Sequence, residues 1–132
     1  MTQRLSGLGA IIGNYDALLV DLWGCVHNGV EPFPAAVDAL SRATAAGVTV
    51  CLLSNGPRRV SAIVKRLDEM GVPRDVYQHV VTSGEATWRA LSSPSDAWHK
   101  ALGRRCYHLG PDRDDSVRQD AGLEIVTKLS EA

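Results

Sequence analysis

The sequence contains no apolar stretch near the roughly 20 residues that a membrane-spanning helix needs. Its amino terminus also lacks a basic segment followed by a long apolar run, the pattern of a secretory leader. Cysteine is scarce: the three residues Cys25, Cys51 and Cys106 are odd in number and widely spaced, and they fit neither a disulfide framework nor a zinc cluster. We therefore expect a soluble, cytoplasmic protein with reduced thiols and no membrane partner.

The chain also has no large excess of charge of either sign. The chain has 14 Lys and Arg against 15 Asp and Glu, a formal net charge of -1 at pH 7. Its basic residues are scattered, whereas nucleic acids and anionic lipids bind clustered ones, so we expect no nucleic-acid partner.

What the chain does have is apolar residues. At 132 residues and 45% hydrophobic it can bury a real core, which excludes a disordered protein.

Apolar runs that end in polar residues alternate with helix-like segments. Residues 17–20 form a continuous apolar run that ends at Asp21, the pattern of a strand buried on both faces of a parallel sheet. A second run, 48–53, ends at Ser54. Further strands are expected at 80–81, 106–109 and 123–126.

Proline, glycine and capping residues mark the expected helices. Pro34 and Pro57 suit the first turns of two of them, which Gly47 and Gly71 close. The sequence Thr-Ser-Gly-Glu at 82–85 is typical of a capping box that begins a third helix. A loop is expected at 92–95, and a short polar helix at 112–119.

This alternation predicts an open, doubly wound α/β sheet of Rossmann-like form, with right-handed crossovers. Ligands of such sheets collect at the carboxyl ends of the strands. There, Asp21 is a candidate nucleophile or metal ligand, and Ser54, Asn55 and the Gly56 amide are candidate phosphate ligands. Each feature alone also fits a turn or a helix cap, but together, one strand-helix-strand unit apart, they favour phosphoryl transfer.

Three segments resemble the haloacid dehalogenase superfamily. Residues 18–29 are similar to its first motif and 51–55 to its second, while 81–87 resemble the branch with a large cap inserted after the second motif, class IIA. With 107–111 entering the cap, the resemblance covers nearly the whole chain. It implies an N-terminal core portion at 1–92, the start of an α/β cap subdomain at 93–132, and hydrolysis of a small phosphorylated metabolite.

The resemblance also implies a role for each candidate residue. Asp21 would attack phosphorus and become an aspartyl phosphate, and with the backbone carbonyl of Trp23 it would bind Mg²⁺. Ser54 would hold a phosphate oxygen, helped by Asn55 and the Gly56 amide. Magnesium suits such a site because it takes few protein ligands and keeps water and phosphate oxygens as the others.

Two departures from the family pattern bear on activity. Trp23 stands where the family usually has a second Asp, and indole cannot transfer a proton near neutral pH, so general acid–base help of roughly 10²–10⁴-fold must come from elsewhere. His27 is the nearest candidate, and the alternative is a loop histidine without a chemical role. The family's later lysine and acidic-pair motifs are not found before Ala132, so we expect an incomplete core.

Three hypotheses remain open. The first is a magnesium-dependent phosphatase that acts through Asp21 on a small phosphorylated metabolite, with activity expected only if the lysine and acidic-pair motifs are supplied. The second is a non-catalytic, truncated module of the same fold that binds phosphate or self-associates through exposed apolar surface. The third is a receiver domain phosphorylated at its strand-end Asp, which the sequence around Asp21 and Ser54 fits less well.

Overall fold

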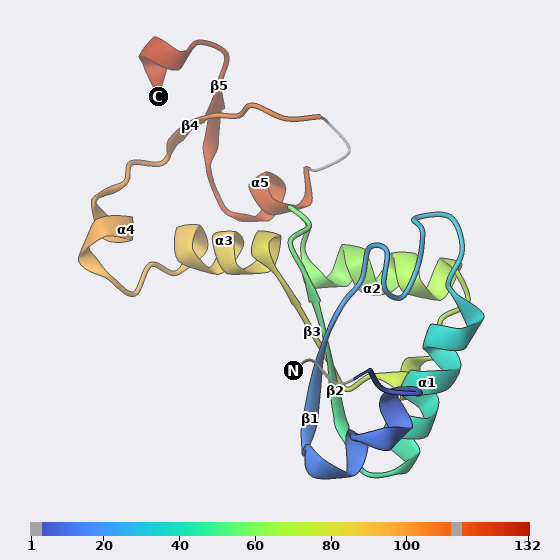
Figure 1. The fold of residues 1–132 in the computed structure, drawn as a ribbon. Coiled ribbons are helices and arrows are strands. Elements are labelled where there is room, and N and C mark those ends of the chain that lie inside the picture. The colour runs from blue at the N-terminus through green and yellow to red at the C-terminus, as the bar shows by residue number, and fades with distance from the viewer. Residues whose placement is uncertain (1–3, 112–114) are drawn as a thin grey trace. The chain divides into compact units, whose positions relative to one another are not determined.

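The computed structural model describes residues 4–111 and 115–132. Tertiary contacts divide the chain into two compact units (Figure 1). The first contains the residues up to Ser54 together with Val64–Val81, and the second contains Asn55–Ile63 and Thr82–Ala132. Each unit is described by itself.

A three-stranded sheet in the order β1-β2-β3 forms the centre of the first unit. Its strands are β1 (Ala17–Asp21), β2 (Thr49–Ser54) and β3 (His79–Thr82). Strands β1 and β2 are parallel, and their register runs from Ala17 opposite Thr49 to Asp21 opposite Leu53. The Rossmann-like α/β fold that the sequence predicts is confirmed.

Helix α1 (Pro34–Ala45) connects β1 to β2, and α2 (Val60–Glu69) connects β2 to β3. Pro34 occupies the first turn of α1, where a missing N–H costs nothing. Gly47 adopts φ +85°, a left-handed conformation that ends the helix and turns the chain toward β2. Three short 3₁₀ turns, Leu8–Ala10, Ile12–Asn14 and Arg74–Val76, complete the elements of this unit.

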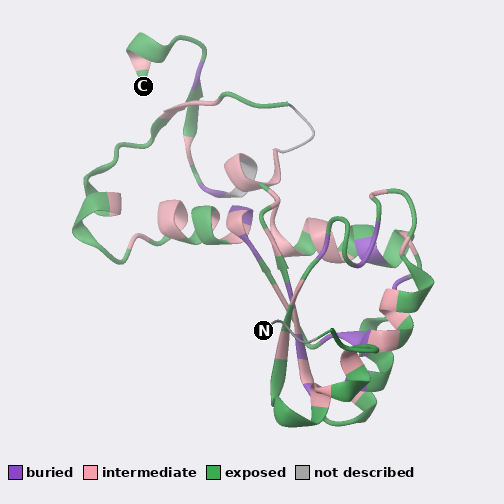
Figure 2. Cartoon of the chain, viewed as in Figure 1, coloured by how far each residue is buried: buried purple, intermediate pink, exposed green. Residues whose placement is uncertain are grey.

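The buried residues of the first unit lie on its strands and helices (Figure 2), and the alternating exposure along the strands places the core on one face of the sheet. Val50 and Leu52 are fully buried on that face, and the helices contribute Leu40, Ala43 and Leu67. The expectation that β1 is buried on both faces is wrong: Leu19, which points the other way, is 74% exposed. The physical reason is topological, because strands that follow chain order with right-handed crossovers carry their connecting helices on the same face.

The described residues of the second unit contain a two-stranded parallel sheet and three complete helices. Arg105 of β4 pairs with Glu124 of β5, and Tyr107 with Val126. Its elements are α3 (Ser83–Ser92), α4 (Ala97–Ala101), β4 (Arg105–Tyr107), α5 (Ser116–Asp120), β5 (Glu124–Val126) and a 3₁₀ turn, Leu129–Glu131. The helix expected at 112–119 is found from Ser116 onward, and its residues 112–114 lie outside the described residues.

Arg104 ties the start of β4 to the turn that precedes β5, at one end of this small sheet. Its guanidinium donates hydrogen bonds to the carbonyls of Ala121 (2.6 Å), Gly122 (2.7 Å) and Leu91 (3.0 Å). Ala121 is buried, so the bonds fix the turn that leads from α5 into β5.

The predicted boundary between core and cap at residue 92 stays a prediction. Within 4–111 and 115–132, no helix is long and apolar enough to cross a membrane.

The one-sided core predicts different effects for two adjacent leucines of β2. Replacing Leu52, which is fully buried, by alanine should lower the free energy of unfolding by about 2–5 kcal/mol, because the change leaves a cavity. Leu53→Ala is the matched control: that side chain is 45% exposed, so its loss should cost less than about 1 kcal/mol. Urea titration followed by circular dichroism measures both, and equal losses would contradict the one-sided core.

Candidate functional site

The two predicted strand-end residues lie on neighbouring strands at the same edge of the sheet. Asp21 is the last residue of β1, and Ser54 is the last residue of β2. Asp21 pairs with Leu53 in the parallel register, so Ser54 follows one residue later on a strand about 4.8 Å away. Asp21 is exposed and Ser54 is half-buried. The carboxyl edge of the first unit therefore carries both a carboxylate and a hydroxyl.

The loop after Asp21 is held by its own backbone. The Asp21 Oδ1 accepts a hydrogen bond from the Leu22 N–H (2.8 Å), which orients the carboxylate. The Leu22 carbonyl accepts bonds from the N–H groups of Val26 (2.9 Å) and His27 (3.2 Å), and the His27 carbonyl accepts one from Gly24 (2.9 Å). These bonds bridge Trp23 to His27 without using the Trp23 carbonyl. That carbonyl is the one the family resemblance assigns to Mg²⁺.

His27 lies inside this loop and is 9% exposed. Its Nδ1 accepts a hydrogen bond from the Gly29 N–H at 3.0 Å, which only an unprotonated Nδ1 can do. Burial is the largest cause that lowers the pKa of His27, the nearby charge of Arg66 lowers it further, and the charge of Asp21 opposes both. A neutral imidazole whose Nδ1 holds the loop fits the structural role better than that of a general acid.

Trp23 projects from the same loop and is 70% exposed. Its ring meets the ring of His27 edge-on, with centroids 5.9 Å apart and an angle of 83° between the planes. Gly29 has φ +91°, and a Cβ atom there would lie 2.4 Å from the benzene part of the indole. The Gly29 carbonyl in turn accepts a hydrogen bond from Arg66 of α2 (3.0 Å). Sequence reasoning missed both Gly29 and Arg66 as residues that shape this loop.

The segment after Ser54 belongs to the second unit. The Gly56 carbonyl accepts hydrogen bonds from the Ser83 hydroxyl (3.1 Å) and the Gly84 N–H (3.2 Å). The expectation that Pro57 opens the next helix is wrong, because α2 begins at Val60. The Thr82 hydroxyl donates to the Arg58 carbonyl (2.6 Å), which holds this stretch as a bend rather than a helical turn. Phosphate binding by Asn55 and the Gly56 amide stays a prediction.

The start of α3 explains the Thr-Ser-Gly-Glu pattern at 82–85. The Thr82 hydroxyl accepts the Glu85 N–H (2.9 Å), as expected of a capping box. The Glu85 carboxylate instead accepts bonds from the Val60 N–H (3.2 Å) and the Arg59 guanidinium (2.7 Å), so it caps α2. Gly84 is required there, since a Cβ atom would lie 2.3–2.6 Å from the backbone of Arg58.

The donor set at the edge of the sheet suits a magnesium ion. An exposed carboxylate on Asp21 and a carbonyl on Trp23 are hard oxygen ligands, and Mg²⁺ commonly uses only one or two protein oxygens. Within the described part of the chain, no cluster of three or more His, Cys, Asp or Glu side chains offers an alternative site. The residues present therefore fit the predicted ion, and its binding remains to be tested.

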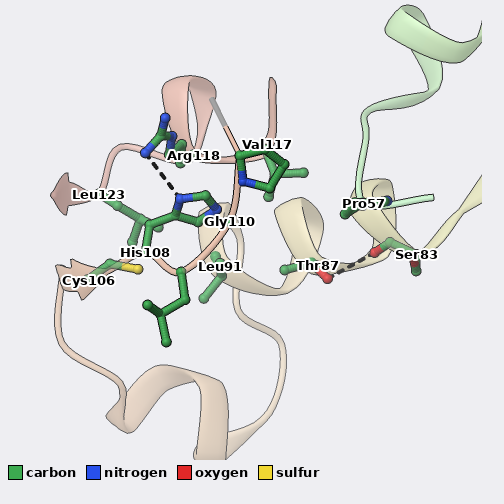
Figure 3. Close-up of a pocket in the computed structure, with 13 residues that line it drawn as sticks. Pro57, Ser83, Thr87, Leu91, Cys106, His108, Gly110, Val117, Arg118 and Leu123 are labelled. Carbon is green, nitrogen blue, oxygen red and sulfur yellow. Dashed lines mark hydrogen bonds between the residues drawn. The ribbon is translucent and has the colours of Figure 1, made fainter. Parts of the chain in front are cut away.

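A cavity of about 330 Å³ lies within the second unit (Figure 3). Leu91 of α3, Cys106 of β4 and Val117 of α5 contribute to its walls. On one side, His108 Nδ1 lies 3.2 Å from the guanidinium of Arg118. None of the five predicted site residues is among those that line this cavity, although its lining residues Ser83 and Gly84 both donate hydrogen bonds to the Gly56 carbonyl.

A parallel α/β sheet with a carboxylate and a hydroxyl at its carboxyl edge defines a class of proteins that bind phosphate groups at their strand ends. The model of the haloacid dehalogenase-like hydrolase family matches residues 18–124. The chain belongs to this family, and the match agrees with the predicted large-cap branch, class IIA.

Similar proteins are consistent with this membership. A glycerol-3-phosphate phosphatase of Gallus gallus is 30% identical over 126 residues, which cover 92% of this chain and 38% of the relative. The crystal structure of a haloacid dehalogenase-like hydrolase from Brucella suis 1330 matches with 36% identity and a TM-score of 0.82, over 95% of this chain and 44% of that one. A hypothetical protein from Pyrococcus horikoshii OT3 shares the fold at 21% identity and a TM-score of 0.55, over 83% and 40% of the two chains. The chain thus spans less than half the length of these relatives.

The Glu85 contacts predict a defined acid sensitivity. The Arg59 hydrogen bond lowers the pKa of Glu85 below its ordinary value of 4.5, so the ionised carboxylate favours the folded state above that pH. The contribution is lost as the pH falls from 4.5 through the lowered pKa. Glu85→Gln should cost about 1 kcal/mol near neutral pH and should weaken the acid-induced loss of stability.

Urea titrations at about pH 7 and about pH 3.5 measure this effect. The matched control is Glu69→Gln, which removes an exposed glutamate that pairs with Arg66 across the surface of α2. Surface pairs of this kind contribute little to stability, so the control should behave like the parent. An unchanged pH dependence in Glu85→Gln would contradict the assigned role.

Proposed function

We propose that this chain carries the nucleophile and the phosphate-binding strand end of a magnesium-dependent phosphatase. It would hydrolyse a small phosphorylated metabolite through an aspartyl phosphate on Asp21. The observation that carries the proposal is the parallel register of β1 and β2, which ends Asp21 and Ser54 at one edge of the sheet. The name of the Gallus gallus relative supports hydrolysis of a phosphate ester as the reaction.

The chemistry follows from the groups at that edge. The Leu22 N–H holds one oxygen of Asp21, and the other attacks phosphorus. The Ser54 hydroxyl, Asn55 and the Gly56 amide would donate hydrogen bonds to the phosphate oxygens, where negative charge increases during transfer. Asp21 and the Trp23 carbonyl would hold Mg²⁺, which supplies positive charge to the phosphate when bound. Water then attacks the aspartyl phosphate and releases inorganic phosphate.

Replacing Asp21 by asparagine tests the nucleophile. Release of phosphate from 4-nitrophenyl phosphate in the presence of Mg²⁺ should fall to background, since the amide cannot form the acyl phosphate. The matched control is Asp16→Asn, which changes an exposed aspartate just before β1, at the opposite end of the strand. Phosphate release by Asp21→Asn at the parent rate would refute the assignment.

A second measurement does not depend on turnover. Beryllium fluoride with Mg²⁺ forms a stable analogue of an aspartyl phosphate, and ¹⁹F NMR detects its bound form. The parent and Asp16→Asn should show the bound signal, and Asp21→Asn should not. A bound signal in Asp21→Asn equal to that of the parent would place the phosphate site elsewhere.

The exposure of Trp23 and of one sheet face favours a second function, a non-catalytic module that binds phosphate or self-associates. Leu19 (74% exposed), Leu53 (45%) and Val81 (48%) are the apolar side chains concerned. On this proposal the beryllium fluoride signal appears without phosphate release. The first proposal requires both.

Self-association through β1 would add an apolar contact between copies of the chain. We expect the parent to sediment as a dimer or larger species and Leu19→Lys to shift it toward the monomer, because a charge cannot be buried there without a partner. Leu129→Lys is the control, since Leu129 is similarly exposed at 72% but lies in the second unit. A parent that sediments as a monomer at all concentrations would contradict self-association.

A further inference from the structure

Trp23 is an unusual residue to find exposed beside a candidate nucleophile. Its side chain is 70% exposed although it is large and mostly apolar, and only Leu22 separates it from Asp21 in the chain. Leu22 links the two through its backbone: its N–H donates to Asp21 Oδ1, and its carbonyl accepts the N–H of His27, whose ring meets the indole edge-on. The carboxylate and the indole are therefore held by the same short loop.

The indole is held in place rather than left to rotate. Its benzene part lies against Gly29, where a Cβ atom would approach to 2.4 Å, and its edge meets His27. Gly29 is fixed from both sides, because its N–H donates to His27 Nδ1 and its carbonyl accepts from Arg66. The ring surface turned away from Gly29 and His27 is open to solvent. A flat ligand can stack on that surface without first ordering the side chain.

The loop that carries Trp23 is also rigid at its far end. The Asn28 side chain accepts hydrogen bonds from the N–H groups of Val30 and Glu31, both at 2.9 Å. The Phe33 N–H donates to the Val26 carbonyl (2.8 Å), and Val26 is fully buried. These bonds anchor the loop to the core at both ends, so the position of the indole relative to Asp21 is preorganised.

We propose that Trp23 is a stacking surface that selects phosphate monoesters of an aromatic or heteroaromatic hydroxyl group, with the phosphate on the Asp21 side and the ring on the indole. This inference deepens the proposed function and rests on it. Stacking of a flat ring on an aromatic side chain raises affinity for nucleic-acid bases roughly tenfold or more, and an aromatic leaving group offers the same kind of surface.

The chemistry of the leaving group points to the same substrates. When Asp21 attacks phosphorus, the bond from phosphorus to the ester oxygen breaks and that oxygen leaves with the electron pair. The indole has no proton to give near neutral pH, so the leaving oxygen must take its proton from water. A phenol has a pKa of about 10 and leaves readily as an anion. An aliphatic alcohol has a pKa far above that of a phenol, close to that of water, and does not.

Binding of two non-hydrolysable phosphonates tests the stacking surface. Phenylphosphonate and propylphosphonate carry the same anionic group on a flat ring and on an alkyl chain. In the presence of Mg²⁺, the parent chain should bind phenylphosphonate roughly tenfold more tightly, the effect of one stacked ring. Calorimetry measures the two dissociation constants, and the Trp23 indole N–H signal in NMR should shift with phenylphosphonate.

Three variants separate stacking from other effects. Trp23→Leu should lose the preference for the phenyl compound, and Trp23→Phe should keep most of it, while both keep the backbone carbonyl. Trp98→Leu is the matched control, because Trp98 is similarly exposed at 67% but lies in α4 of the second unit. A preference that survives in Trp23→Leu, or equal binding of both phosphonates by the parent, would overturn the inference while leaving the proposed function intact. Failure of the parent to bind either one would count against the phosphate site itself.

The rates of phosphate release from different esters provide an independent test. Phosphate release by the parent should fall steeply from 4-nitrophenyl phosphate to phenyl phosphate and be at least roughly 100-fold slower with glycerol 3-phosphate, an alkyl ester. Trp23→Asp supplies a carboxyl group that can carry a proton, so this variant should reduce the difference between the esters. Glycerol 3-phosphate hydrolysed by the parent as fast as phenyl phosphate would overturn the inference. Where turnover is too slow to measure, the binding ratio decides the question.

Discussion

The parallel pairing of β1 with β2 is the constraint on which the candidate site depends. Because Asp21 pairs with Leu53, the two strands end within one residue of each other, and both terminal side chains emerge at one edge of the sheet. Fully buried Val50 and Leu52 hold β2 in this register. A slip by one residue would turn these side chains to the opposite face, so the apolar core and the polar edge are fixed together.

The loop that follows β1 is held in one conformation and gives this edge of the sheet a defined surface. Its backbone folds back onto Leu22, His27 contributes an acceptor rather than a charge, and Arg66 reaches from α2 to the Gly29 carbonyl. These contacts do not use the groups proposed to act. The Trp23 carbonyl takes no part in the backbone bridge between Trp23 and His27, and the Trp23 ring remains open to solvent. If Asp21 acts as the proposed nucleophile, the indole beside it favours leaving groups that need no proton.

In the second unit, the first turn of α3 also caps the start of another helix, α2. Glu85 belongs to the first turn of α3, yet its carboxylate caps α2 through the Val60 N–H and pairs with Arg59, whose guanidinium lies 3.5 Å from the centroid of the Trp88 ring. Gly84 permits the close approach that this arrangement needs. One short segment thus secures the starts of two helices, α2 and α3, and it explains why the capping pattern is present while only half of its usual bonding is found.

Local patterns in the sequence were sufficient to predict the alternation of strands and helices, the strand ends at Asp21 and Ser54, and the family. Each of these depends on residues close together in the chain, such as the apolar run before Asp21 or proline at the start of α1. The exposure of Leu19, the start of α2 at Val60 and the contacts of Gly29 and Glu85 could not be predicted this way. They depend on partners 24 to 37 residues away, or on which face of the sheet the helices cover, and only the tertiary structure decides those.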